Sequence, residues 1–181
     1  WGSPAIAPDG TIYSGTGYGG NGGTHLHAIH ANGTKKWVFD TATGPGIAGS
    51  VYGSAAIGLD GTVYFGSENN YVYALYPDNG SIKPGWPYNT GGTVRSSPCL
   101  GVDGTVYIGS QNVGIHAILS NGTAKPGWNS ATSGAIGSVW SGPSVSEDGF
   151  IYCAEGWSGG GGGFYALYET NGTQAPVFDH D

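Results

Sequence analysis

The sequence has few charged side chains, and few of these are basic. Charged residues make up 9% of the 181 residues, against roughly 25% in an average soluble domain. Five Lys and Arg stand against 12 Asp and Glu, which gives a formal net charge of -7. Because binding to a phosphate backbone depends on clustered Lys and Arg, this composition argues against a nucleic-acid partner.

Long apolar runs, methionine and cysteine clusters are also missing. The apolar runs are only a few residues long, so we expect no membrane span, and no signal peptide is visible. Since no Met occurs, we expect a chain that was processed or taken from a longer one. Cys99 and Cys153 allow at most one disulfide and form no zinc pattern. Their positions in predicted strands favour two buried thiols, and an extracellular or periplasmic location is compatible with both readings.

Glycine, in contrast, is abundant. The chain holds 37 Gly and 10 Pro, and these residues separate short runs rich in Val, Ile, Tyr and Phe. This is typical of many short strands joined by turns. With 38% apolar and 13% aromatic residues, the chain has enough to bury and is not expected to be disordered.

One pattern occurs four times along the chain. A period of about 45 residues with four short strands per unit predicts a β-propeller blade. We therefore expect an all-β propeller of four four-stranded antiparallel blades, covering about 1–43, 44–92, 93–137 and 138–181. The repeated segments are SPAIAPDGTIYSG (3–15), SAAIGLDGTVYFG (54–66), SPCLGVDGTVYIG (97–109) and GPSVSEDGFIYCA (142–154).

Each unit also carries an Asp-Gly and an Asn-Gly pair. In the third unit, Asp103-Gly104 and Asn121-Gly122 predict two-residue hairpin turns in which Gly takes a positive φ. The Asn-Gly-Ser/Thr triplets are also acceptors for N-linked sugar, and both interpretations stay open. The candidate glycosylation sites, which share one exposed turn position, are Asn32, Asn79, Asn121 and Asn171.

The repeat resembles that of the pyrroloquinoline-quinone-type, or quinoprotein-like, propeller family. The shared features are the Asp-Gly turn, Val-Tyr-x-Gly, Tyr-Ala-Leu, a following Gly and a Trp. DGTVYFGSENNYVYALYPDNGSIKPGW (60–86) matches best, and the resemblance covers essentially the whole chain. In that family the Ala and Trp pack between blades. This implies blade docking for Trp37, Trp86 and Trp128, and for Phe178, which departs from the pattern in the fourth unit.

The resemblance also bears on the size of the ring. Quinoprotein-like propellers typically have about seven or eight blades, so four units imply half of an eight-bladed ring. The other half is either a second copy of this chain, related by two-fold symmetry, or further chain.

The variable end of the predicted propeller holds the candidate ligand site. The loops at 16–24 and 156–163 are longer than their counterparts, and binding residues usually lie on such loops of a rigid scaffold. The slot before the first strand of each unit faces the mouth of the central channel. We expect a platform for sugar rings or a peptide, although the slot also suits packing against the adjacent blade. The platform residues are Trp1, Tyr18, Tyr52, Arg95, Trp140 and Trp157.

Motifs for catalysis and cofactors are weak. A quinone-dependent dehydrogenase of the family often has adjacent cysteines, and most of the Asp residues here lie in turns. GTGYGG (15–20) is followed by a predicted strand, whereas a dinucleotide fingerprint opens a helix. His27 and His116 occupy the slot of Tyr73 and Tyr165, which favours aromatic substitutes over a metal site. We expect no catalytic residues, cofactor or metal.

These patterns favour a non-catalytic extracellular or periplasmic scaffold for protein or glycan binding. The family resemblance implies the same, since it extends to the bacterial outer-membrane-protein assembly lipoprotein, which binds protein partners. Two alternatives stay open. One is a structural subunit of an extracellular assembly, formed through a homodimer or higher self-association, and the other is a fragment of a quinone-dependent dehydrogenase.

Overall fold

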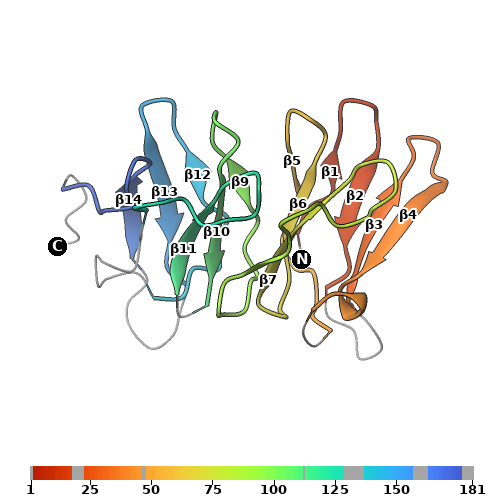
Figure 1. The fold of residues 1–181 in the computed structure, drawn as a ribbon, viewed down its shortest axis with the longest axis horizontal. Coiled ribbons are helices and arrows are strands. Elements are labelled where there is room, and N and C mark those ends of the chain that lie inside the picture. Colours follow the sequence, from red (N-terminus) through yellow and green to blue (C-terminus); the bar gives the residue numbers. More distant parts are fainter. Residues whose placement is uncertain are drawn as a thin grey trace.

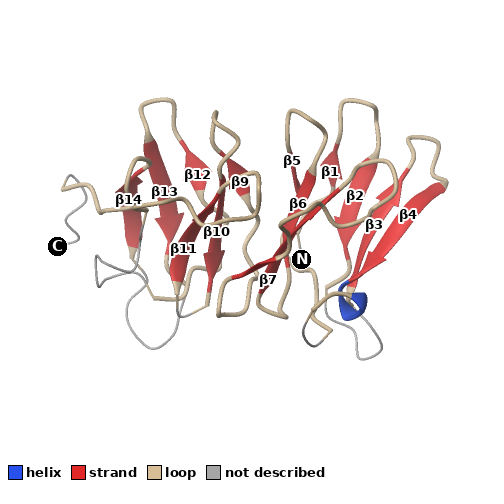
Figure 2. Cartoon of the chain, in the orientation of Figure 1, coloured by secondary structure: helices blue, strands red, loops and turns tan. Residues whose placement is uncertain are grey.

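The computed structural model describes residues 2–17, 23–45, 48–111, 113–128, 137–156 and 163–176. Four antiparallel sheets stand side by side along the long axis of the molecule, with the first at the right and the fourth at the left of Figure 1. Figure 2 shows that the described elements are strands apart from η1 (Thr41–Thr43), a single turn of 3-10 helix. The predicted all-β propeller fold is confirmed, and the sheets are called blades 1 to 4 below.

Each blade is a meander of short strands in chain order. Blade 1 contains β1 (Ala5–Ile6), β2 (Ile12–Gly15), β3 (His25–Ile29) and β4 (Lys35–Asp40). Blade 2 contains β5 (Ala56–Ile57), β6 (Val63–Gly66), β7 (Tyr71–Leu75) and β8 (Tyr88–Asn89). Blade 3 contains β9 (Cys99–Leu100), β10 (Val106–Ser110) and β11 (Gly114–Ile118), and blade 4 contains β12 (Ser144–Val145), β13 (Phe150–Ala154) and β14 (Phe164–Tyr168).

The outermost strand departs from the prediction of four strands per blade. It is continuous in blade 1, where β4 contains no proline. In the described residues of blades 3 and 4 it is reduced to isolated bridges, between Ile118 and Ala124 and between Leu167 and Gln174. Prolines follow at once in this segment, as in Lys125-Pro126-Gly127. Because proline has no backbone N–H to donate, it interrupts the strand ladder.

The Asp-Gly turns are one residue longer than predicted. In blade 3 the Gly101 N–H donates to the Thr105 carbonyl at 2.8 Å, and the Gly104 N–H donates to the Gly101 carbonyl at 3.0 Å. A two-residue type I′ turn needs positive φ at both central residues. Gly104 has φ of 79°, but Asp103 does not take a positive φ. Its carboxylate instead accepts from the Thr105 N–H at 2.9 Å, which stabilises a type I turn followed by a left-handed glycine.

The core lies between the blades. Three clusters of buried side chains join blades 1 and 2, blades 2 and 3, and blades 3 and 4. In each of the first three blades a strand Tyr packs on the Trp that follows, and these pairs have centroid separations of 5.6, 5.5 and 5.7 Å. The pairs are Tyr13 with Trp37, Tyr64 with Trp86, and Tyr107 with Trp128.

The same tryptophans reach the next blade. The Trp37 Nε1 donates to the Pro77 carbonyl at 2.8 Å, and the Trp86 Nε1 donates to the Ser120 carbonyl at 3.1 Å. The Trp128 Nε1 is buried and has no partner among the described residues. Phe178 lies outside the described residues. The indole hydrogen bond therefore links blades 1 to 2 and 2 to 3.

An Asp, a Thr and a Lys form a repeated contact at the turn end of blades 1 to 3. The Asp60 carboxylate accepts from the Thr62 N–H at 3.0 Å, from the Thr62 hydroxyl at 2.7 Å and from the Lys83 Nζ at 2.9 Å. Partial burial opposes ionisation, but the hydrogen bonds from Thr62 and Lys83 outweigh it and lower the pKa of Asp60 to about 2. In blade 4, Phe150 and Ala175 replace the Thr and the Lys.

Both cysteines are free thiols, Cys153 buried and Cys99 half-buried. Burial raises the pKa of Cys99 to about 12, with the Glu169 charge adding to the shift. The pKa of Cys153 is also raised to about 12, by burial and then by Glu155. They lie in the cluster between blades 3 and 4, so they contribute to packing as thiols.

Replacement of Trp86 or Trp128 by Phe tests the indole hydrogen bond between blades. We expect Trp86→Phe to lower the free energy of unfolding by about 1–2 kcal/mol more than Trp128→Phe. Both changes remove the same atoms, but only the first leaves a carbonyl, that of Ser120, without its donor. Urea unfolding followed by circular dichroism measures both values. Equal losses would mean that the bond adds nothing to stability.

The Asp60 pKa makes stability depend on pH. An unfolded Asp titrates near pKa 3.9, so the lowered folded pKa stabilises the protein above about pH 4, and this contribution is lost as pH falls through about 2. We expect Asp60→Asn to flatten the decline in the free energy of unfolding over this range. Asp148→Asn is the matched control, because blade 4 lacks the Thr and Lys at this turn. An unchanged decline in Asp60→Asn would contradict the assignment.

Candidate functional site

Tyr52, Arg95 and Trp140 come together at the variable end of the propeller. Each precedes the first strand of its blade, so the repeat places the three side chains in consecutive slots around one hollow. The Arg95 guanidinium lies between two rings, 5.4 Å from the Tyr52 centroid and 5.0 Å from the Trp140 centroid. We call these three residues the aromatic–arginine platform.

Glu68 fixes the guanidinium in place. It lies in the turn between β6 and β7, where its N–H donates to the Ser50 carbonyl at 3.0 Å. Its Oε1 accepts from the Arg95 Nε at 2.8 Å and lies 2.7 Å from the Arg95 Nη2. The pair places one positive and one negative charge side by side, so the platform carries no net charge from these two groups. The site therefore suits a ligand without a strong charge.

Sequence reasoning missed Glu68. The available signal was an acidic residue in a chain poor in charge, placed in a loop at the same end as Arg95. Without the structure, nothing in the spacing connects a loop of blade 2 with the slot of blade 3.

The hollow has a volume of about 570 Å³ and a wall of close-packed backbone. The Gly2 N–H donates to the Tyr52 carbonyl at 2.5 Å, and the Ser54 N–H donates to the Ser97 hydroxyl at 2.8 Å. A Cβ on Gly53 would lie 2.3 Å from the Ser96 carbonyl oxygen, so only glycine permits this approach. The segments that precede the first strands thus hold the platform in a fixed geometry.

The platform presents flat surfaces that are partly open to solvent. Trp140 is 40% exposed, and the Arg95 side chain is 38% exposed. Each guanidinium–ring contact contributes about 0.5–1 kcal/mol at such a site. Aromatic faces beside hydrogen-bonding groups bind sugar rings and the side chains of a peptide. The other expected platform residues, Trp1, Tyr18 and Trp157, lie outside the described residues.

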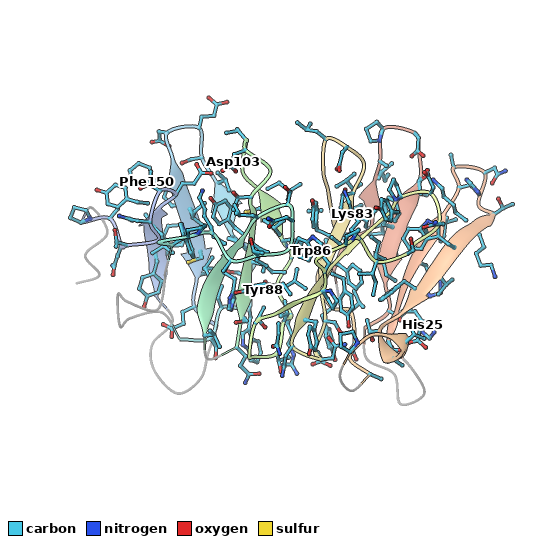
Figure 3. All side chains as sticks on the ribbon, viewed as in Figure 1. His25, Lys83, Trp86, Tyr88, Asp103 and Phe150 are labelled. Carbon is cyan, nitrogen blue, oxygen red and sulfur yellow. The ribbon has the colours of Figure 1, made fainter. Side chains whose placement is uncertain are left out.

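The histidines occupy two different environments. His25 Nε2 lies 3.7 Å from Asp40 Oδ2. Figure 3 shows His25 at the lower end of the molecule and Asp103 at the upper end. The His25 and His27 rings are 5.9 Å apart, and burial followed by the nearby His25 lowers the pKa of His27. Burial lowers the pKa of His116 to about 4, so this ring packs as a neutral group near Tyr88.

In the described part of the chain, no three His, Cys, Asp or Glu side chains are arranged to hold a metal ion. The second half of the GTGYGG motif, residues 18–20, lies outside the described residues.

The Asn-Gly turns share one set of side-chain contacts but differ in length, and none of them is the predicted two-residue turn. The Leu119 N–H donates to the Thr123 carbonyl across three residues in blade 3, whereas the Tyr76 N–H donates to the Ser81 carbonyl across four residues in blade 2. The Asn121 Oδ1 accepts from the Thr123 N–H at 3.1 Å and from the Thr123 hydroxyl at 2.7 Å. The same two bonds occur at the other three turns, and all four asparagines are exposed. These contacts account for the Asn and the Ser or Thr as turn residues, and glycosylation stays a prediction at Asn32, Asn79, Asn121 and Asn171.

A second hollow lies between blades 2 and 3 at the turn end. Its volume is about 520 Å³, and its lining includes Leu59 and Val102 at the tips of neighbouring turns. Both tips are fully exposed to solvent. Leu59 lies at the turn end, away from the platform, and is therefore a useful control position.

No protein-family model matches this chain, and a comparison with curated proteins gave no match. No helix in the described residues is long and apolar enough to cross a membrane.

Solved structures with the same fold do exist. The chain is similar to BamB from Moraxella catarrhalis, with a TM-score of 0.64 and 22% identity over 96% of this chain and 51% of that chain. The computationally designed Ika8 protein gives a TM-score of 0.67 with 10% identity over 98% of this chain and 48% of that one. A protein of unknown function from Bacteroides caccae gives 0.63 and 13%, over 94% and 57%. The chain spans about half the length of these proteins, and the likeness to BamB, a PQQ-like β-propeller lipoprotein, supports the propeller fold.

Proposed function

We propose that this protein is a non-catalytic propeller scaffold that binds a protein or carbohydrate partner at the aromatic–arginine platform. The observation that carries the proposal is the Arg95 guanidinium held between the Tyr52 and Trp140 rings, partly exposed above a hollow of about 570 Å³. We further propose an extracellular or periplasmic location, which the likeness to BamB supports.

The residue types and their fixation support this function. Trp, Tyr and Arg are the residues most enriched among those that dominate binding energy. Here Glu68 holds the Arg side chain, and the guanidinium lies against both rings, so little side-chain freedom is lost when a partner binds. A preorganised, nearly neutral surface favours recognition by shape and stacking over steering by charge.

A protein partner and a glycan partner are supported by different observations. The likeness to the propeller BamB suggests a protein-binding scaffold, and it therefore favours a protein partner. The flat rings favour either partner, since both sugar rings and apolar side chains stack on Trp and Tyr.

Removal of the Trp140 ring tests the proposal. We expect wild-type protein to bind a defined set of members on peptide and glycan arrays, and Trp140→Ala to weaken that binding by about tenfold or more. Tyr76→Ala is the matched control, because Tyr76 is also 40% exposed but lies at the turn end. Surface plasmon resonance with the array hits measures the three dissociation constants.

Two results would contradict the platform assignment. Equal binding by Trp140→Ala and wild type would place the partner elsewhere. Loss of the folded state in Trp140→Ala, seen as a lost thermal transition, would mean that the ring serves packing between blades.

A further inference from the structure

The ion pair at the aromatic–arginine platform leaves hydrogen-bonding atoms uncommitted. The Nε and the Nη2 of Arg95 meet the same oxygen of Glu68, Oε1, at 2.8 and 2.7 Å. In the part of the chain that the structure describes, no hydrogen bond reaches Glu68 Oε2 or Arg95 Nη1. The pair therefore offers one acceptor oxygen and one donor nitrogen on side chains that are 23% and 38% exposed.

Ser97 adds a third such group on the wall of the same hollow. Its hydroxyl oxygen accepts from the Ser54 N–H at 2.8 Å, and it lines the hollow together with Arg95 and Trp140. A hydroxyl also has one proton to donate, and no acceptor for the Ser97 proton occurs among the described residues. The hollow thus presents donors from Arg95 and Ser97, with an acceptor from Glu68 beside it.

This set of groups discriminates between classes of ligand. A carboxylate or phosphate that approached Arg95 would be repelled by Glu68, and an ammonium group that approached Glu68 would be repelled by Arg95. A purely apolar side chain would cover the uncommitted atoms and separate them from water, which is costly for charged groups. The ligand that fits is neutral and rich in hydrogen-bonding groups.

Neighbouring hydroxyls match these atoms, because a hydroxyl donates one hydrogen bond and accepts others. Two of them on one sugar ring can accept from the Arg95 guanidinium and donate to the Glu68 carboxylate at the same time. The Asn or Gln side chain of a peptide also carries donors and an acceptor, but a sugar has further hydroxyls that reach Ser97. The ring also fixes its hydroxyls in place, so less freedom is lost on binding.

The aromatic part of the hollow suits the apolar face of a sugar ring. Trp140 is 40% exposed, and its ring centroid lies 5.0 Å from the Arg95 Cζ. Such a surface binds the C–H face of a ring while polar groups beside it bind the edge. The volume of about 570 Å³ lies within the range of roughly 300–1,000 Å³ for ligand pockets.

We propose that the platform binds a neutral carbohydrate through adjacent hydroxyls of a sugar ring, and that Glu68 determines this specificity. The inference rests on the platform as the binding site of the proposed function, and it names the ligand class. Glu68 accepts a hydroxyl proton through Oε2 while Oε1 keeps Arg95 in place. Its charge also excludes acidic sugars, which the guanidinium alone would attract.

A glycan array with neutral members and members that carry a uronic acid tests the assignment. We expect wild type to bind neutral glycans and not acidic ones. Glu68→Gln should weaken binding of the tightest neutral member by about tenfold, because it removes a charge-assisted hydrogen bond. It should also gain binding to the acidic members. Glu147→Gln is the matched control, since it removes the same charge from an exposed turn between β12 and β13, and it should change neither.

Arg95→Lys separates the guanidinium from its charge. Lys keeps a positive charge beside Glu68 but lacks the planar fork of donors, so affinity for the same neutral glycan should fall by about tenfold. Acidic glycans should still be rejected, because the pair stays neutral. Titration calorimetry measures the dissociation constants, and thermal transitions monitored by circular dichroism confirm that each variant is folded.

The outcomes separate this inference from the proposed function. Binding of wild type to peptides but to no neutral glycan, with loss of that binding in Trp140→Ala, would overturn the carbohydrate assignment and leave the platform as the site. Binding to neither array would overturn both. A neutral glycan bound equally by wild type and Glu68→Gln, or equal binding of acidic and neutral glycans by wild type, would contradict the role of Glu68.

Discussion

The structure depends on the burial of each blade face against the next blade. A single blade has strands of two to six residues, and one such sheet is marginal in water. Each cluster of buried side chains in the described residues draws on two blades. Stability is therefore a property of neighbouring pairs, as in other repeat proteins, and the Tyr, Ala and Trp of the repeat recur because each pair needs them.

The same packing explains how a site forms without any local motif. Close contact between the segments that precede the first strands, at Gly2, Gly53 and Ser97, sets the distance between successive slots. Residues in equivalent slots of different blades then face one hollow, although Tyr52 and Trp140 are far apart in the chain. The slot lies outside the alternating strand positions that fill the core, and its residue type differs between blades, with Tyr52, Arg95 and Trp140 in successive slots.

Features that repeat could be predicted from the sequence, and features that depend on one unit could not. Alignment of the units predicted the number of blades and the proximity of Tyr52, Arg95 and Trp140. Both follow from one local pattern that is repeated around an axis. The turn length was wrong because Asp103 bonds to Thr105 and keeps a negative φ, which the Asp-Gly pair alone does not reveal. Glu68 was missed because its contact with Arg95 joins two different units.

Blade 4 departs from the repeat at three positions. Phe150 replaces the Thr that anchors the turn Asp, Ala175 replaces the Lys, and Phe164 replaces an aliphatic residue. The Phe150 N–H donates to the Ser146 hydroxyl at 3.1 Å, whereas the Thr62 N–H of blade 2 donates to the turn Asp60. The Phe150 ring packs on Tyr152 and Tyr168, and the Phe164 ring stacks on Tyr152. Blade 4 therefore replaces a charged contact at the turn with contacts between aromatic rings.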